Sequence, residues 1–129
     1  MPHLTVEYTG NLGADADIPA LLRKANAVLI AQGGVFPTGG IRSRAIRLDD
    51  FCVADGTADD AFVHLTLKIG AGRSAEQKTK TGDDLFAMVR EHFAALFASR
   101  FLALSLEIQE FSEAGTWKQN NIHGRYKAA

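Results

Sequence analysis

The chain has 129 residues, of which 47% are hydrophobic and 22% are charged, and its formal net charge is −1. This composition fits one folded domain and excludes a disordered chain. The nearly neutral charge argues against nucleic acid as a partner, since phosphate binding requires a basic excess. With one cysteine and no apolar stretch of membrane-spanning length, we expect a cytoplasmic protein without disulfides and without membrane attachment.

A proline occupies position 2, and a strand pattern follows at once over residues 3–8. If Met1 is removed, as the small following residue should permit, Pro2 gains a terminal secondary amine. An α-amino group titrates at about 7.7–8.0, so modest desolvation or a nearby cation leaves it neutral at neutral pH. Such an amine can accept a proton as a general base and return it as a general acid. A Met-Pro start alone is weak evidence, because proline is a common residue.

The sequence repeats itself weakly, because residues 3–10 resemble residues 64–71. In each half, an amphipathic helix pattern and another strand pattern follow. The first helix begins at the cap Asp17, and the second opens with the capping-box pair Ser74 and Gln77. One apolar face is predicted for the second helix, formed by Leu85, Phe86, Val89, Phe93, Leu96 and Phe97. Alternating residues predict strands over 63–69 and 102–109.

This order of elements predicts an α+β fold built from two fused β-α-β units. Each unit has a crossover with parallel strands, and together they form a four-stranded sheet with two helices on one face. We expect a single domain over 1–129, with pseudo-repeat halves of about 1–56 and 57–129. The opposite face carries polar residues such as Thr5, Glu7, Thr66 and Glu107, and we interpret it as an assembly face.

Arginines near the end of the first half are candidate anion ligands. Arg42 and Arg44 share one side of the predicted strand, and Arg47 lies on the other. Arg73 follows a glycine-rich turn directly before a helix N-terminus, which favours anions. A guanidinium binds a carboxylate through two parallel hydrogen bonds. For Arg47 we favour a solvated edge-strand role.

The remaining reactive residue types are interpreted as structural. His3 and His64 occupy equivalent strand positions, where hydrogen-bonding roles are more common than catalytic ones. His92 and His123 have no partners at zinc-ligand spacing. Cys52 has no activating motif nearby, so we expect it to be a small packed residue.

Several motifs together resemble the 5-carboxymethyl-2-hydroxymuconate Δ-isomerase family of the tautomerase superfamily. The similarity covers nearly the whole chain. Its motifs are Met1-Pro2-His3, Gly40-Ile41-Arg42-Ser43-Arg44, the segment 61–74, His92-Phe93-Ala94-Ala95-Leu96, Leu102-Ala103-Leu104-Ser105 and Lys118-Gln119-Asn120-Asn121.

The resemblance implies that Pro2 carries the proton and that Arg42 and Arg73 bind and polarise the carboxylate or 2-keto end of the substrate. Arg44 and Lys118 are further substrate-binding candidates, and neither a metal nor an organic cofactor is implied. Val63 falls where shorter relatives have their terminal proline. Because an internal residue has no terminal amine, the resemblance implies one site per chain.

The implied substrate is a small polycarboxylate dienol. The implied reaction converts 5-carboxymethyl-2-hydroxymuconate to its 2-oxo isomer in homoprotocatechuate (4-hydroxyphenylacetate) degradation. Two alternatives stay open: a promiscuous tautomerase acting on another 2-hydroxy-dienoate or a phenylpyruvate-like enol acid, and a non-catalytic trimeric ligand-binding homologue.

The resemblance also implies a cyclic homotrimer. We expect three sheets to face inward and the tail over 116–121, with the lone Trp117, to lie across a neighbouring chain.

Overall fold

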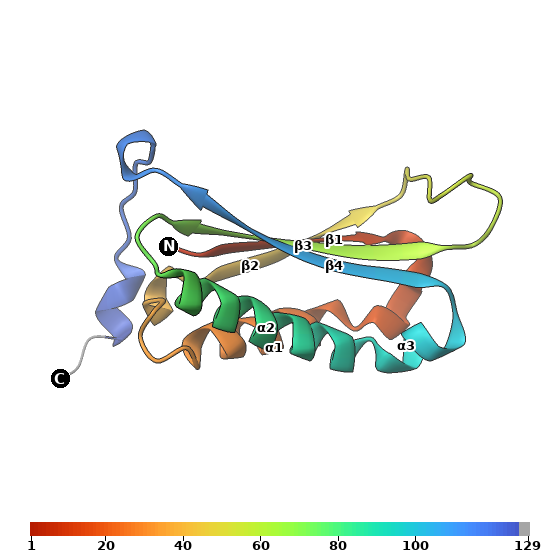
Figure 1. Ribbon diagram of the computed structural model, residues 1–129, viewed down its shortest axis with the longest axis horizontal. Coiled ribbons are helices and arrows are strands. Elements are labelled where there is room, and N and C mark those ends of the chain that lie inside the picture. The colour runs from red at the N-terminus through yellow and green to blue at the C-terminus, as the bar shows by residue number, and fades with distance from the viewer. Residues whose placement is uncertain (127–129) are drawn as a thin grey trace.

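The computed structural model describes residues 1–126, and its two long helices lie on one face of a four-stranded sheet (Figure 1). The strands are β1 (His3–Thr9), β2 (Arg42–Leu48), β3 (Ala61–Gly70) and β4 (Leu102–Phe111). The helices are α1 (Ile18–Ile30), α2 (Ala75–His92) and α3 (Ala94–Ser99). Short 3-10 turns complete the fold: η1 (Gly10–Ala16), η2 (Thr38–Gly40), η3 (Glu113–Gly115) and η4 (Ile122–Tyr126).

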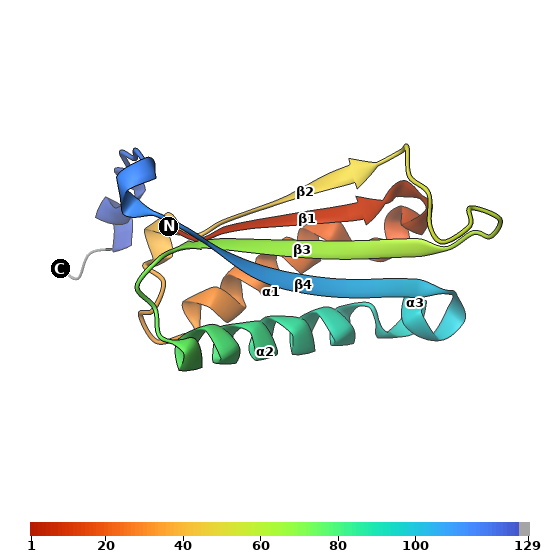
Figure 2. The same ribbon diagram turned by 45° about the horizontal axis from the view of Figure 1, so that its top comes forward.

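The sheet joins the two halves through an antiparallel central pair. The strand order is β2-β1-β3-β4, as Figure 2 shows; β1 pairs with β2 and β3 with β4 in parallel, whereas β1 and β3 are antiparallel. The predicted α+β fold of two β-α-β units is therefore confirmed. Because β1 and β3 run in opposite directions, the first residues of β1 and β2 lie at the same end of the sheet as the last residues of β3 and β4.

Both helices begin at the caps that the sequence predicts. Asp17 accepts a hydrogen bond from the backbone N–H of Ala20 at 3.4 Å. The Ser74 hydroxyl accepts from the Gln77 backbone at 3.1 Å, and the Gln77 side chain accepts from the Ser74 backbone at 3.0 Å, which completes the capping box. These bonds satisfy N–H groups that would otherwise lack a partner at the helix start.

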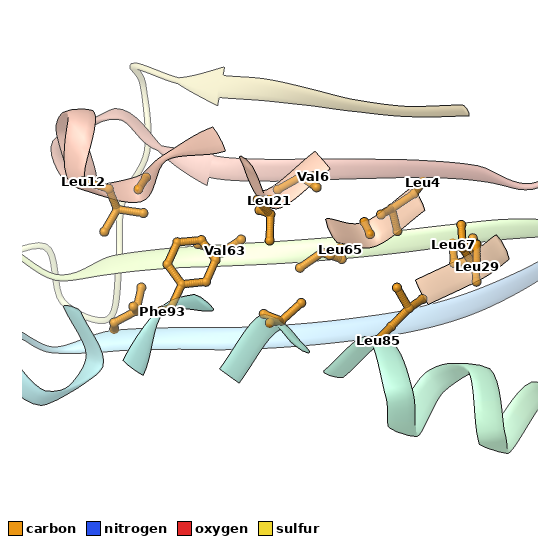
Figure 3. Close-up of a cluster of buried hydrophobic side chains, with 14 of the residues drawn as sticks. Leu4, Val6, Leu12, Leu21, Leu29, Val63, Leu65, Leu67, Leu85 and Phe93 are labelled. Carbon is orange, nitrogen blue, oxygen red and sulfur yellow. The ribbon is translucent and has the colours of Figure 1, made fainter. Parts of the chain in front are cut away.

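The core lies between the sheet and the helices (Figure 3). Its central side chains are fully buried, and burial of each such side chain stabilises the fold by about 1.5–3 kcal/mol. They include Leu4, Val6, Leu65 and Leu67 from the sheet and Leu21, Leu29, Leu85 and Phe93 from the helices or their ends. This packing fixes β1 and β3 at their centre and therefore positions the residues at their ends.

Two sequence-based expectations are wrong. The second helix does not run unbroken to residue 97, because the chain leaves helical geometry at Phe93, with φ −97° and ψ 11°. Phe93 is fully buried and anchors this junction, whereas Phe97, in α3, is 59% exposed. Cys52 is exposed rather than packed, because it lies in the loop between β2 and β3 and not in an element of the core.

The second face of the sheet is polar, and no helix of residues 1–126 lies on it (Figure 1). His64 bonds Ser105 Oγ through Nδ1 at 2.7 Å and Glu107 Oε1 through Nε2 at 3.1 Å. His3 Nδ1 lies 3.2 Å from the Arg44 guanidinium. Both histidines therefore make side-chain contacts with strand neighbours, and their structural role stays a prediction. Within residues 1–126, no helix is both long and apolar enough to cross a membrane.

Candidate active site

The candidate site forms at the end of the sheet where the start of the chain lies next to segments from both halves. Pro2 is buried, and its carbonyl accepts a hydrogen bond of 3.1 Å from the backbone N–H of Arg42. On its other side, His3 pairs with Lys68 near the end of β3. The chain then turns at Gly70 and reaches Arg73 just before α2. The strand register therefore brings Arg42 and the turn that carries Arg73 to the same end of the sheet.

Arg73 is held in place by backbone and aromatic contacts. Its guanidinium donates to the Gly70 carbonyl at 3.1 Å and to the Val35 carbonyl at 3.0 Å. The same group lies 4.9 Å from the ring centre of Phe36, which is 2% exposed. A guanidinium has five N–H donors, so these bonds fix its position and leave donors to bind an anion.

Arg42 contacts the first residue of the chain. Its Nη1 donates to the Gly40 carbonyl at 3.0 Å and to the Met1 thioether sulfur at 3.1 Å. A Cβ atom at Gly40 would lie only 3.1 Å from Met1 Cγ, so the glycine lets this loop approach the start of the chain. Met1 therefore fills the space beside the Arg42 guanidinium.

The electrostatic environment of the chain start is cationic. The pKa of the Met1 amino group is lowered, first by burial and then by the charges of Lys118, Arg73 and, more weakly, Arg42; Glu113 acts in the opposite direction. Lys118 and Glu113 also face each other at 3.9 Å. Three cations and one carboxylate therefore act on this position, which suits a neutral amine and an anionic ligand.

The structure brings together most of the predicted site residues. Pro2, Arg42, Arg73 and Lys118 lie around the chain start. Arg44 is exposed on the bare sheet face and contacts His3, the residue next to Pro2, and its part in substrate binding stays a prediction. Burial and the Arg44 charge lower the pKa of His3 and so favour its neutral form.

Arg47 was predicted to be a solvated residue, and this is confirmed. Its side chain is 61% exposed and pairs with Asp49 at 3.1 Å. It also projects from the other side of β2 than Arg42 and Arg44. It therefore provides a matched control for the two site arginines.

Sequence reasoning named Lys118 in the C-terminal segment but missed Asn120 and Glu113 of the same segment and the loop before η2. Asn120 donates to the Gly39 carbonyl at 2.9 Å, which ties the tail to η2 of its own chain. Glu113 faces Lys118, and Phe36 supports Arg73. The one sequence signal for Asn120 was its place in the motif Lys118-Gln119-Asn120-Asn121. A polar segment without periodicity does not show where its side chains lie in the fold.

Other parts of the described chain offer no competing metal cluster. Within residues 1–126, no three His, Cys, Asp or Glu side chains are grouped as metal ligands. An open groove of about 630 Å³ lies between α2 and β4, lined by residues such as Phe86, Leu106 and Ile108. None of its lining residues belongs to the cationic site.

The fold, a pair of fused β-α-β units, is that of the tautomerases. A fused 4-OT chain described as a symmetric trimer has this fold, with a TM-score of 0.70 over 90% of each chain at 15% identity. A solved 5-carboxymethyl-2-hydroxymuconate isomerase from Deinococcus radiodurans R1 is far more similar, with a TM-score of 0.94, 61% identity and coverage of 98% of this chain and 95% of that one.

Sequence comparisons agree with the structural ones. The family model for 5-carboxymethyl-2-hydroxymuconate isomerase matches residues 2–126. An Escherichia coli protein named 5-carboxymethyl-2-hydroxymuconate Delta-isomerase is 50% identical over 127 residues, which cover 98% of this chain and 100% of that protein. The chain therefore belongs to the 5-carboxymethyl-2-hydroxymuconate isomerase family, as its motifs predicted, and is an enzyme of the isomerase class.

Proposed function

We propose that this isomerase converts 5-carboxymethyl-2-hydroxymuconate to its 2-oxo isomer in homoprotocatechuate degradation, with the amine of Pro2 as the proton carrier after Met1 is removed. The observation that carries the proposal is the buried chain start surrounded by Arg42, Arg73 and Lys118. A substrate with several carboxylates matches this excess of positive charge. Family membership supplies the chemical class of substrate.

The proposed reaction moves one proton and uses no other reactant. The neutral Pro2 nitrogen accepts the proton of the 2-hydroxyl group, which leaves a dienolate with its negative charge spread over oxygen and carbon. The resulting ammonium then gives a proton to carbon, so that the 2-oxo product forms and the amine is neutral again. Arg42 and Arg73 hold the carboxylate and oxyanion end of the substrate and stabilise the developing charge.

A spectrophotometric assay with a panel of dienols tests this proposal. We expect protein whose intact mass shows loss of Met1 to turn over 5-carboxymethyl-2-hydroxymuconate with a higher kcat/KM than other 2-hydroxy-dienoates or phenylpyruvate enol. A higher kcat/KM for one of those compounds would assign a different substrate. No turnover of any of them would identify a non-catalytic homologue.

The two charged side chains at the rim of the site should shift the pH profile in opposite directions. A protonated amine cannot accept a proton, so kcat/KM falls as the pH drops through the pKa of Pro2. We apply to Pro2 the charge effects found at the neighbouring Met1 amine. Lys118→Met removes a cation that lowers the pKa, so the acid limb moves to higher pH. Glu113→Gln removes the carboxylate that raises the pKa, so the limb moves to lower pH.

The measurement is kcat/KM against pH for both variants and the parent enzyme at constant ionic strength. Arg125→Gln is the matched control, because Arg125 is an exposed cation of the same tail and is not among the charges that act on the amine. Shifts of the same sign for Lys118→Met and Glu113→Gln would contradict the proposed arrangement.

We propose that three chains form a cyclic trimer with their bare sheet faces inward. The face has no helix on it, β2 and β4 are edge strands, and Trp117 is 89% exposed. An open edge and a broad half-polar face favour association. We further propose that 1–129 is a single domain whose halves, about 1–56 and 57–129, are copies of one unit.

Light scattering at micromolar concentration tests the trimer, for which we expect a mass of three 13.9 kDa chains. Although the described tail contacts η2 of its own chain, truncation before Thr116 should weaken the trimer if Trp117 also packs on a neighbour. A mass near that of one chain, or a truncated trimer of full stability, would refute this arrangement.

A further inference from the structure

The side chain of Met1 occupies a small polar niche beside Pro2. Its sulfur lies 3.1 Å from Arg42 Nη1 and 3.6 Å from Asn120 Nδ2, and its Cγ lies close to Gly40. A thioether is a weak acceptor, whereas a guanidinium and an amide are strong donors. The two donors are therefore poorly matched to the sulfur and well matched to oxygen.

The orientation of the Asn120 amide follows from its hydrogen bonds. Its Oδ1 accepts from the backbone N–H of Ile122 at 2.7 Å, so its nitrogen must be the group on the opposite side. The nitrogen has two N–H donors, of which one bonds the Gly39 carbonyl at 2.9 Å. The second donor is directed at the Met1 sulfur.

The tail is held in this position by close packing on η2. A Cβ atom at Gly39 would lie 2.8 Å from the backbone of His123, so only glycine permits this contact. Asn120 is half-buried, whereas the adjacent Asn121 is exposed. The amide of Asn120 is therefore fixed before any ligand arrives, which reduces the entropy lost on binding.

We propose that Asn120 is a substrate-binding residue: in the enzyme without Met1, its amide and the Arg42 guanidinium together hold one carboxylate of the substrate in the niche that the Met1 side chain fills. This inference rests on the proposed function for the identity of the substrate. The niche adjoins Pro2, so a carboxylate held there places the reacting end of the substrate beside the amine. Retained Met1 then blocks the site twice, by converting the amine of Pro2 to an amide and by filling the niche.

Steady-state kinetics and a binding probe test the proposal separately. We expect Asn120→Ala to raise KM for the dienol about 10- to 100-fold, because a hydrogen bond to a charged group contributes that much affinity. Asn120→Asp should raise KM further, because a carboxylate would repel the substrate. Asn121→Ala is the matched control and should leave both kcat and KM unchanged.

The binding probe is 2-oxoadipate, a saturated dicarboxylate with a 2-oxo group. Its dissociation constant is measured by calorimetry. Asn120→Ala should weaken binding of 2-oxoadipate about tenfold or more. Retention of Met1 in the unsubstituted chain should have the same effect. The Met1-retained protein is obtained with a methionine-aminopeptidase inhibitor and verified by intact mass. Far-UV circular dichroism and thermal unfolding show whether each variant is folded. If Asn120→Ala is unfolded, the Met1-retained protein still provides the comparison.

The outcomes separate this inference from the proposed function. Equal probe affinity and equal KM for Asn120→Ala and Asn121→Ala would overturn the role of Asn120, as would unchanged probe affinity in the Met1-retained protein. Absence of dienol turnover in the processed enzyme, together with probe binding that depends on Asn120, would instead refute the substrate and preserve the binding site.

Discussion

Replacement of Pro2 by alanine is expected to lower kcat by about 100-fold, with a much smaller change in KM, because the remaining primary amine is held less firmly and a misplacement of about 1 Å can cost that much. The primary amine of alanine lacks the ring that fixes the nitrogen at the start of β1. A terminus blocked by Met1 should abolish turnover, because an amide nitrogen has no basic lone pair. The measurement is kcat and KM for protein whose terminus has been verified by intact mass.

Two observations control for loss of structure. Pro2 is buried, so thermal unfolding must show that Pro2→Ala retains the fold at the assay temperature. The substitution should also leave 2-oxoadipate binding nearly unchanged, because Arg42, Arg73 and Asn120 remain. Unchanged turnover by protein with a verified blocked terminus would remove Pro2 from the mechanism.

The fold could be predicted from the sequence because each element has a clear local signal. Period-2 alternation marks β3 and β4, and the caps at Asp17 and Ser74 mark where both helices start. The break at Phe93 could not be predicted in this way. The apolar pattern continues across it, yet Phe93 leaves helical geometry as a fully buried residue and Phe97 in α3 is exposed.

The family resemblance named Arg42 and Arg73 as site residues, and the strand register explains why they lie close together. Arg42 lies beside the chain start because β1 and β2 are parallel neighbours, and the β3 turn reaches it because β1 and β3 are antiparallel. The tail had no periodic signal. Asn120 is placed by its hydrogen bond to Gly39, and Glu113 faces Lys118 within the same tail, and such contacts leave no periodic pattern in a polar sequence. Arg44, on the same strand side as Arg42, contacts His3, whereas Arg42 contacts Met1.

The two site arginines are expected to have the second large effect. Arg42→Ala and Arg73→Ala should each lower kcat/KM by about 30- to 1,000-fold, which corresponds to a loss of about 2–4 kcal/mol of transition-state stabilisation for one charge-stabilising donor. Arg73 is fixed by Gly70, Val35 and Phe36, so its charge is in place before the dienolate forms. The measurement is kcat/KM for the dienol at a pH where Pro2 is neutral.

Arg47→Ala is the control that separates a site role from a general effect of lost positive charge. Its exposed ion pair with Asp49 contributes about 0–1 kcal/mol at most, so this variant should retain nearly full kcat/KM. Arg73→Lys keeps the charge but loses the planar fork, and an intermediate loss is expected. Because Arg73 also bonds two backbone carbonyls, unfolding curves must accompany the kinetics. Equal losses for Arg42→Ala, Arg73→Ala and Arg47→Ala would show that these arginines act through the long-range field of the chain rather than by contact with the dienolate.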